Sequence, residues 1–86
     1  MSDSPTTLVL YTTAGCHLCE QAQRLIEEQV TPGDPRWQLE LSDIAEDALL
    51  MERYGIRIPV LQRADNGEEL GWPFDGSALA AFLADA

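Results

Sequence analysis

Lysine is absent from this sequence, and all five of its basic residues are arginines, set against fifteen acidic residues. The formal net charge is −10 at pH 7. Proteins that bind nucleic acid rely on cationic contacts to phosphate, and anionic membrane surfaces attract basic segments. The charge balance therefore argues against nucleic acid and membranes as partners. It favours a solvated acidic surface, with the steering of a basic partner as the alternative.

Long apolar runs are missing as well. The apolar run near the N-terminus covers only residues 8–11, and residues 1–5 carry no basic region. A secretory signal peptide needs a longer apolar stretch behind a positive start, and a membrane-spanning helix needs about 20 apolar residues. We therefore expect a cytoplasmic protein. In that compartment a disulfide is more often transient and catalytic than structural.

The length and composition bound the domain organisation. A chain of 86 residues with 45% apolar and 23% charged residues is typical of one soluble globular domain with a modest core. We expect residues 1–6 to be a flexible N-terminus and residues 7–86 to form the domain.

Apolar periodicity and turn residues predict seven structural elements. They are a strand over 7–11, a helix from 16 that ends before the segment 31–35, a strand over 37–41, a helix over 44–54, an extended segment over 56–61, a strand over 68–72 and a last helix that Asp75 caps. Strands that alternate with helices favour a parallel pair, and a closing hairpin adds an antiparallel pair. The fold class is therefore α/β in the order β-α-β-α-β-β-α, a four-stranded mixed sheet flanked by three helices.

Cysteine is scarce, and both copies fall in one four-residue window as Cys16-x-x-Cys19. A residue at the start of a helix lies beside unsatisfied amide N–H groups and the positive end of the helix dipole. Those groups stabilise a thiolate and lower the pKa of a thiol from its free value of about 8.5. We therefore expect Cys16 to be the nucleophile. Cys19, one turn further into the helix, is expected to be more buried and to act as the resolving thiol.

His17, the only histidine, lies between the two cysteines. A protonated or N–H-donating imidazole favours a neighbouring thiolate, so His17 is a candidate catalytic residue. The alternative is a solvent-facing helix residue with no part in the chemistry.

Three other uses of the two cysteines are open. Beyond Cys16, His17 and Cys19 the chain offers only carboxylates, so a closed zinc site needs ligands from another subunit. An iron–sulfur cluster shared between two chains is chemically feasible. A structural disulfide closes too small a loop to stabilise the fold much. A redox-active dithiol without a bound metal is the preferred interpretation.

Three segments in matching order resemble the glutaredoxin-like branch of the thioredoxin fold superfamily. A strand at 8–11 leads into Gly15-Cys16-His17-Leu18-Cys19, the segment 54–60 contains Ile58-Pro59, and the segment 65–71 resembles the closing hairpin of that family. The match spans about residues 7–84. The resemblance implies a thioredoxin-like fold and thiol–disulfide oxidoreductase activity.

The resemblance also implies a substrate site. It makes Ile58–Pro59 a cis peptide that faces Cys16, with the backbone before the proline pairing with an extended substrate. The alternative is an ordinary trans proline at an edge strand. The substrate-binding residues that the resemblance implies are Gly15, Arg57, Ile58, Pro59, Asp75, Gly76 and Ser77.

Glutathione is a possible co-substrate by the same resemblance, and no tightly bound cofactor is expected. Its two carboxylates would meet Arg57 and the amides at Gly76-Ser77, where a helix N-terminus favours anions. The chain lacks two features that glutaredoxins usually have, a lysine shortly before the first cysteine and a Gly-Gly pair before the last helix. Arg57 is alternatively a solvated charge, and Asp75 alternatively only a helix cap.

The sequence thus predicts a monomeric dithiol oxidoreductase that acts on protein disulfides or low-molecular-weight mixed disulfides. A reductase or glutathione would return it to the dithiol form. An iron–sulfur cluster carrier and a non-catalytic interaction module on the same fold are the alternatives.

Overall fold

The computed structural model describes residues 5–30 and 33–84, so most of the N-terminal segment expected over 1–6 lies outside the described residues. Eight elements follow one another within those ranges. They are β1 (Thr6–Thr12), α1 (His17–Gln29), β2 (Trp37–Asp43), the 3-10 helix η1 (Ile44–Glu46), α2 (Ala48–Tyr54), β3 (Val60–Arg63), β4 (Glu69–Gly71) and α3 (Gly76–Ala84). The order confirms the predicted β-α-β-α-β-β-α arrangement, with one additional short helix.

The four strands form one mixed sheet in the order β2-β1-β3-β4. β1 and β2 are parallel, with Leu8 opposite Leu39. β1 and β3 are antiparallel, as are β3 and β4. Because Tyr11 is opposite Val60, the loop that follows β1 and the segment that precedes β3 leave the sheet at the same end.

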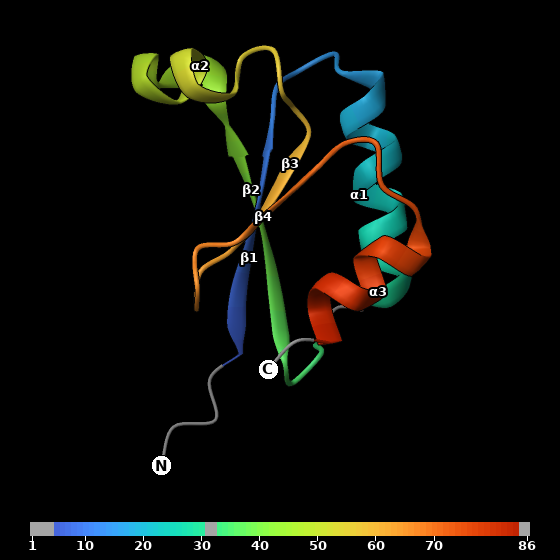
Figure 1. Ribbon diagram of the computed structural model, residues 1–86. Coiled ribbons are helices and arrows are strands. Elements are labelled where there is room, and N and C mark those ends of the chain that lie inside the picture. The colour runs from blue at the N-terminus through green and yellow to red at the C-terminus, as the bar shows by residue number, and fades with distance from the viewer. Residues whose placement is uncertain (1–4, 31–32, 85–86) are drawn as a thin grey trace.

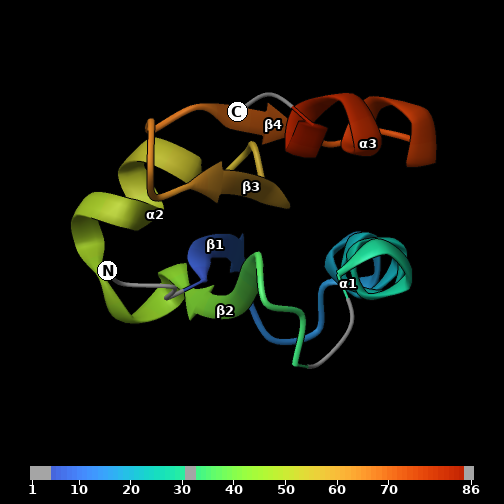
Figure 2. The same cartoon turned by 90° about the horizontal axis from the view of Figure 1, so that it is seen from below.

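The helices are distributed unequally over the sheet. α1 and α3 lie together on one face, whereas α2 lies on the other side at one end of the strands (Figures 1 and 2). The first residues of α1 and the whole of α2 are found at the same end of the molecule, which is the upper end in Figure 1.

Two apolar clusters match these two sides. The larger cluster fills the space between the sheet and the helices α1 and α3, because alternate strand residues point toward them. Its buried members are Leu8, Leu10, Ala22, Ile26, Val30, Trp37, Leu61, Phe74 and Leu79. The smaller cluster lies under α2 and consists of Ile44, Tyr54 and Val60, with Tyr11, Leu50 and Ile58 packed against it.

The helix predicted over 44–54 is divided in two. Asp43 accepts a hydrogen bond from the Ala45 N–H and begins η1, and Asp47 accepts bonds from the N–H groups of Leu49 and Leu50 and begins α2. Two acidic caps four residues apart each start a helix, so a continuous helix does not form. The prediction of one helix was wrong at this point.

The prediction of an extended segment over 56–61 was also wrong for the first half of that segment. The N–H groups of Arg57 and Ile58 both donate to the carbonyl of Tyr54, which closes a turn after α2. Strand β3 therefore begins only at Val60.

One buried charge was not predicted. Arg63 is almost fully buried, donates through Nε and Nη2 to both carboxylate oxygens of Asp65, and donates through Nη1 to the carbonyl of Phe82. Its guanidinium also lies 5.0 Å from the centroid of the Trp37 ring. A buried cation must have such partners to offset its lost hydration. Arg63 thereby joins the β3–β4 hairpin to the last turns of α3.

Candidate active site

Cys16 is the N-cap residue of α1. Its backbone is extended, with φ −89° and ψ 105°, and its Sγ accepts a hydrogen bond from the backbone N–H of Cys19 at 3.1 Å. The preceding Gly15 has φ +77°, a left-handed conformation that glycine adopts without a steric penalty. This turn places the Cys16 sulfur over the first turn of the helix, where unsatisfied N–H groups favour negative charge.

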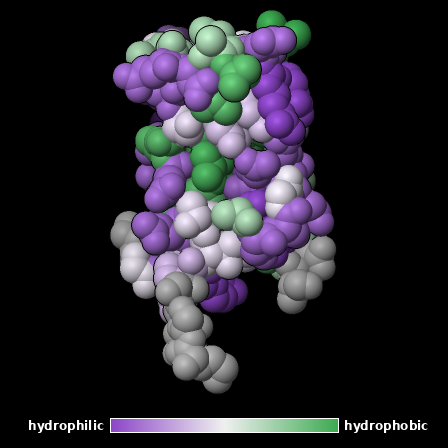
Figure 3. All heavy atoms as spheres, turned by 90° about the vertical axis from the view of Figure 1, so that its left-hand side faces the viewer, coloured by the Kyte–Doolittle hydropathy of each residue, from purple (hydrophilic) through white to green (hydrophobic). Residues whose placement is uncertain are grey.

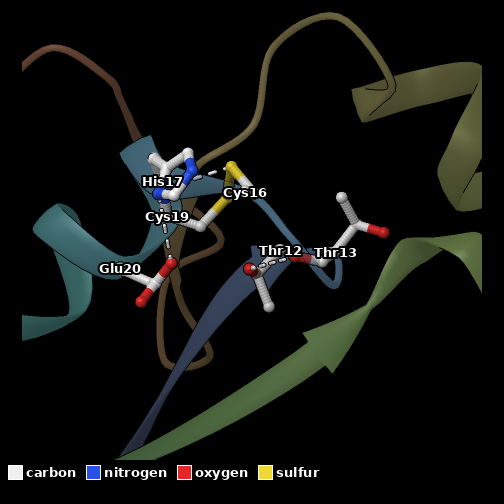
Figure 4. The surroundings of a disulfide bond; sticks show 6 residues. All are labelled: Thr12, Thr13, Cys16, His17, Cys19 and Glu20. Atoms are coloured by element: carbon white, nitrogen blue, oxygen red, sulfur yellow. Dashed lines mark hydrogen bonds and ion pairs between the residues drawn. A yellow bond between two sulfur atoms is a disulfide. The ribbon is translucent and has the colours of Figure 1, made fainter.

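The two cysteines form a disulfide, with their Cα atoms 5.2 Å apart. Figure 4 shows the disulfide where the loop after β1 enters α1. Cys16 is half-buried, whereas Cys19 is only 3% exposed. A reactant from solvent therefore reaches the Cys16 sulfur more readily than the Cys19 sulfur.

His17 lies on the outside of the first turn of α1. Its side chain is 91% exposed, and its Nδ1 is 3.6 Å from a carboxylate oxygen of Glu20 (Figure 4). Glu20 is thus the residue that the imidazole contacts in the described part of the chain. Sequence reasoning did not single out Glu20, although its spacing of three residues from His17 on a helix was a usable signal.

Ile58 and Pro59 lie at the same end of the sheet as Cys16, because Val60 pairs with Tyr11. The Ile58–Pro59 peptide bond is cis, as is Trp72–Pro73, and Pro59 is buried. The Ile58 N–H donates to Tyr54, and the Pro59 carbonyl accepts from the Trp72 N–H at 3.1 Å. The Ile58 N–H is therefore already paired within the chain and is not available to an added substrate strand.

Arg57 faces the α2 side of the molecule. Its Nη2 is 3.3 Å from Glu69 Oε1, and its guanidinium carbon lies 5.7 Å from the centroid of the Tyr54 ring. Arg53 approaches the same carboxylate at 4.0 Å. The hydroxyl of Tyr54 donates to Glu69 Oε2. Burial and the bond to Glu69 raise the pKa of Tyr54 to about 12, so the phenol stays neutral at physiological pH.

Asp75, Gly76 and Ser77 lie away from the disulfide. Asp75 accepts from the Ala78 N–H at 2.8 Å and caps α3. The Gly76 carbonyl accepts from the Gln29 side chain at 2.8 Å. Gln29 is the last residue of α1, about 20 Å along the helix axis from Cys16. The structure therefore brings Gly15, His17 and the Ile58–Pro59 segment to the disulfide end, and does not bring the start of α3 there.

A groove of about 480 Å³ lies between α1 and β2, away from the cysteines. Its lining includes Gln23, Glu27, Val30, Trp37, Leu39 and Leu41, and none of the predicted site residues.

Within residues 5–30 and 33–84, no three His, Cys, Asp or Glu side chains are grouped so that they would hold a metal ion. No helix in this part of the chain is long and apolar enough to cross a membrane.

Comparison with known proteins shows that the chain is similar to glutaredoxin-like and thioredoxin structures. Residues 7–84 match the family model of the glutaredoxin-like domain (DUF836). A structural genomics target protein from X. campestris, solved by X-ray crystallography, is 38% identical, with 92% of this chain and 97% of that chain covered and a TM-score of 0.79. No match was found among curated protein sequences.

Two further solved structures are similar. A protein from Nitrosomonas europaea is 29% identical with a TM-score of 0.68, and the match covers 94% of each chain. A thioredoxin variant from Halobacterium salinarum is 26% identical with a TM-score of 0.68, and the match covers 95% of this chain and 74% of that one.

Proposed function

The chain belongs to the glutaredoxin-like domain family, and on this premise we propose that it is a dithiol thiol–disulfide oxidoreductase. Cys16 is the attacking thiol and Cys19 the resolving thiol. The observation that supports this assignment is the difference between the two sulfurs. Cys16 is half-buried and its sulfur accepts a hydrogen bond from a helix N–H, whereas Cys19 is buried.

The exchange proceeds in two steps from the dithiol form. The Cys16 thiolate attacks one sulfur of the substrate disulfide, forms a mixed disulfide and releases the first substrate thiolate, which takes up a proton. Cys19 then loses its proton to solvent and attacks the Cys16 sulfur. The second substrate thiolate leaves and is protonated in turn. The substrate gains two electrons and two protons, and the protein is left with the Cys16–Cys19 disulfide.

The N-cap geometry supports the first of these steps. When Cys16 is reduced, the Cys19 N–H and the start of the helix act on a sulfur that carries a full negative charge. This interaction favours the thiolate, which is the nucleophilic form, over the thiol. A thiol or a reductase of suitable potential returns the protein to the dithiol form by the reverse exchange.

The substrates proposed are protein disulfides or low-molecular-weight disulfides. The binding of glutathione by Arg57 and by the start of α3 has less support. Arg57 is engaged by Glu69, and the start of α3 lies at the far end of α1. Disulfide exchange itself needs neither group.

Replacement of Cys19 by serine tests the assignment. We expect Cys19→Ser to accumulate a mixed disulfide at Cys16 when the reduced protein meets an uncharged disulfide such as bis(2-hydroxyethyl) disulfide. Mass spectrometry of the intact protein gives the added mass, and peptide mapping gives its position. The matched control is Cys16→Ser, which should accumulate none.

Two outcomes would reject the proposal. In one, wild-type protein does not turn over the small disulfide and Cys19→Ser traps nothing. In the other, the purified protein carries visible absorption that Cys16→Ser removes, which would identify a cluster carrier instead.

A further inference from the structure

The outer side of α2 and the turn after it expose apolar side chains that proteins usually bury. Leu49 is 76% exposed, Met51 46% and Ile56 100%. Leu49 and Met51 lie on α2, and Ile56 lies in the turn that follows it. Figure 3, which views the molecule from the side of α2, shows apolar residues among hydrophilic ones at its upper end. Exposed apolar side chains that lie close together on a protein surface are a feature of interaction sites.

α2 and the turn after it lie at the same end of the molecule as the disulfide (Figure 1). The turn that contains Ile56 leads into Pro59 and β3, and β3 begins opposite the residue where β1 approaches its end. On the other side of the disulfide, Leu18 in the first turn of α1 is 47% exposed. A partner bound at α2 would therefore lie at the same end of the molecule as Cys16, which is half-buried.

The charges around these exposed apolar residues are mostly of one sign. Four acidic residues from the end of β2 through η1 and α2 are all exposed: Asp43, Glu46, Asp47 and Glu52. Arg53 and Arg57 approach the carboxylate of Glu69, and with Glu69 counted the region has five carboxylates against these two arginines. Exposed apolar side chains bordered by carboxylates are complementary to an apolar segment that carries lysine or arginine.

We propose that Leu49, Met51 and Ile56, together with Glu46 and Glu52, form a docking surface for protein substrates whose disulfide is flanked by alternating apolar and basic residues. We name these five residues the α2 surface. The inference rests on the proposed function and adds the substrate class. A second copy of this chain is a poor occupant, because two molecules of charge −10 repel each other.

The test compares three disulfides with the reduced, full-length protein. Two synthetic peptides carry the same internal disulfide, followed by Leu-Lys-Leu-Lys in one and Leu-Glu-Leu-Glu in the other. The third substrate is bis(2-hydroxyethyl) disulfide. At low ionic strength we expect the basic peptide to react on the order of ten times faster than the acidic one. In 0.5 M salt the two rates should converge, because surface charges are then screened.

Two variants separate the contributions of charge and apolar contact. Glu46→Gln combined with Glu52→Gln should remove most of the preference for the basic peptide. Leu49→Ser combined with Ile56→Ser should slow both peptides, by several times more than it slows the small disulfide. The matched control is Leu41→Ser, because Leu41 is also a half-exposed leucine, at 51%, but lies on β2. Thermal melts verify that each variant is folded.

The outcomes are distinct. Equal rates for the two peptides, or equal effects of Leu41→Ser and the Leu49/Ile56 double variant, would overturn the α2 surface while leaving the proposed function intact. Failure to react with all three disulfides would instead overturn the proposed function. If wild-type protein sediments as a dimer that the Leu49/Ile56 double variant dissociates, the surface is a self-interface and the proposal is wrong.

Discussion

The two sides of the sheet are stabilised by different kinds of contact. Between the sheet and the pair α1 and α3, the buried side chains are almost all apolar, with Leu10 and Ile26 fully buried. On the α2 side, Tyr11 and Tyr54 stack with their ring centroids 4.2 Å apart, and Glu69 binds Tyr54 and two arginines around them. The dithiol lies at the end of the sheet where these two sides meet.

This difference assigns the stability of the fold and the proposed disulfide exchange to different parts of the molecule. The apolar side supplies most of the buried area that stabilises the fold, because each buried aliphatic side chain contributes about 1.5–3 kcal/mol. The end with the dithiol buries Cys19 but leaves Cys16, His17 and the α2 surface accessible. Changes on the apolar side should therefore alter unfolding, and changes at the dithiol end should alter exchange. Four substitutions test this separation, from the largest effect to the smallest.

Cys16→Ser should have the largest effect, on exchange alone. Loss of the nucleophile should lower the rate of disulfide exchange by about three orders of magnitude or more. Serine is itself a favourable N-cap residue, so the cap of α1 is retained. The free energy of unfolding, compared between reduced proteins by urea titration, should differ by less than about 1 kcal/mol. Residual exchange close to that of the wild type would contradict the assignment of Cys16.

Ile26→Ala should have the opposite effect. Ile26 is fully buried in the larger cluster, so its truncation should lower the free energy of unfolding by about 2–5 kcal/mol. The exchange rate per folded molecule, measured where the variant remains folded, should stay near that of the wild type. Leu41→Ala is the matched control, and its half-exposed position predicts a much smaller loss of stability.

Tyr54 should make the protein sensitive to alkaline pH. Burial raises its pKa to about 12, above the value near 10 that the unfolded chain has, so its contribution to stability is complete below pH 10 and is lost as the pH rises toward 12. The loss at pH 12 is on the order of 2 kcal/mol. Urea unfolding of the oxidised protein from pH 9 to 12 measures it. Tyr54→Phe should show a smaller alkaline loss, and an identical loss in both proteins would assign it to other groups.

Asp75→Ala should have the smallest effect. Asp75 caps α3, and removal of such a cap costs about 1 kcal/mol. Because α3 begins beside Gln29, far from Cys16, exchange with a glutathione mixed disulfide should be unchanged. A selective loss of that activity, with exchange of an uncharged disulfide retained, would restore Asp75 to the substrate site.

Local patterns predicted the apolar side well. The strands that contain Leu8 and Leu39, and the end of α1 before residues 31–35, follow from runs, alternation and proline content. The position of Cys16 at a helix start follows from the change in periodicity there. These features depend on neighbouring residues, so one sequence is enough to predict them.

The polar contacts were not predictable in the same way. Arg63 is buried because Phe82, nineteen residues later, supplies a carbonyl beside it. Arg57 turns to Glu69, twelve residues away, and Gly76 meets Gln29 across 47 residues. No periodicity encodes such pairs, since they depend on how the finished elements pack. The sequence therefore predicted the position of Cys16 at the start of α1 better than it predicted the contacts of Arg57 and Gly76.

The central claim is that the helix N-terminus makes Cys16 the reactive sulfur. Alkylation of the reduced protein by iodoacetamide across pH 5 to 10, with peptide mapping of each cysteine, tests it most directly. We expect Cys16 to be alkylated with a midpoint below about 8.5, the value of a free thiol, and Cys19 to react far more slowly. Equal alkylation of both cysteines, or a Cys16 midpoint at or above that of a free thiol, would contradict the claim.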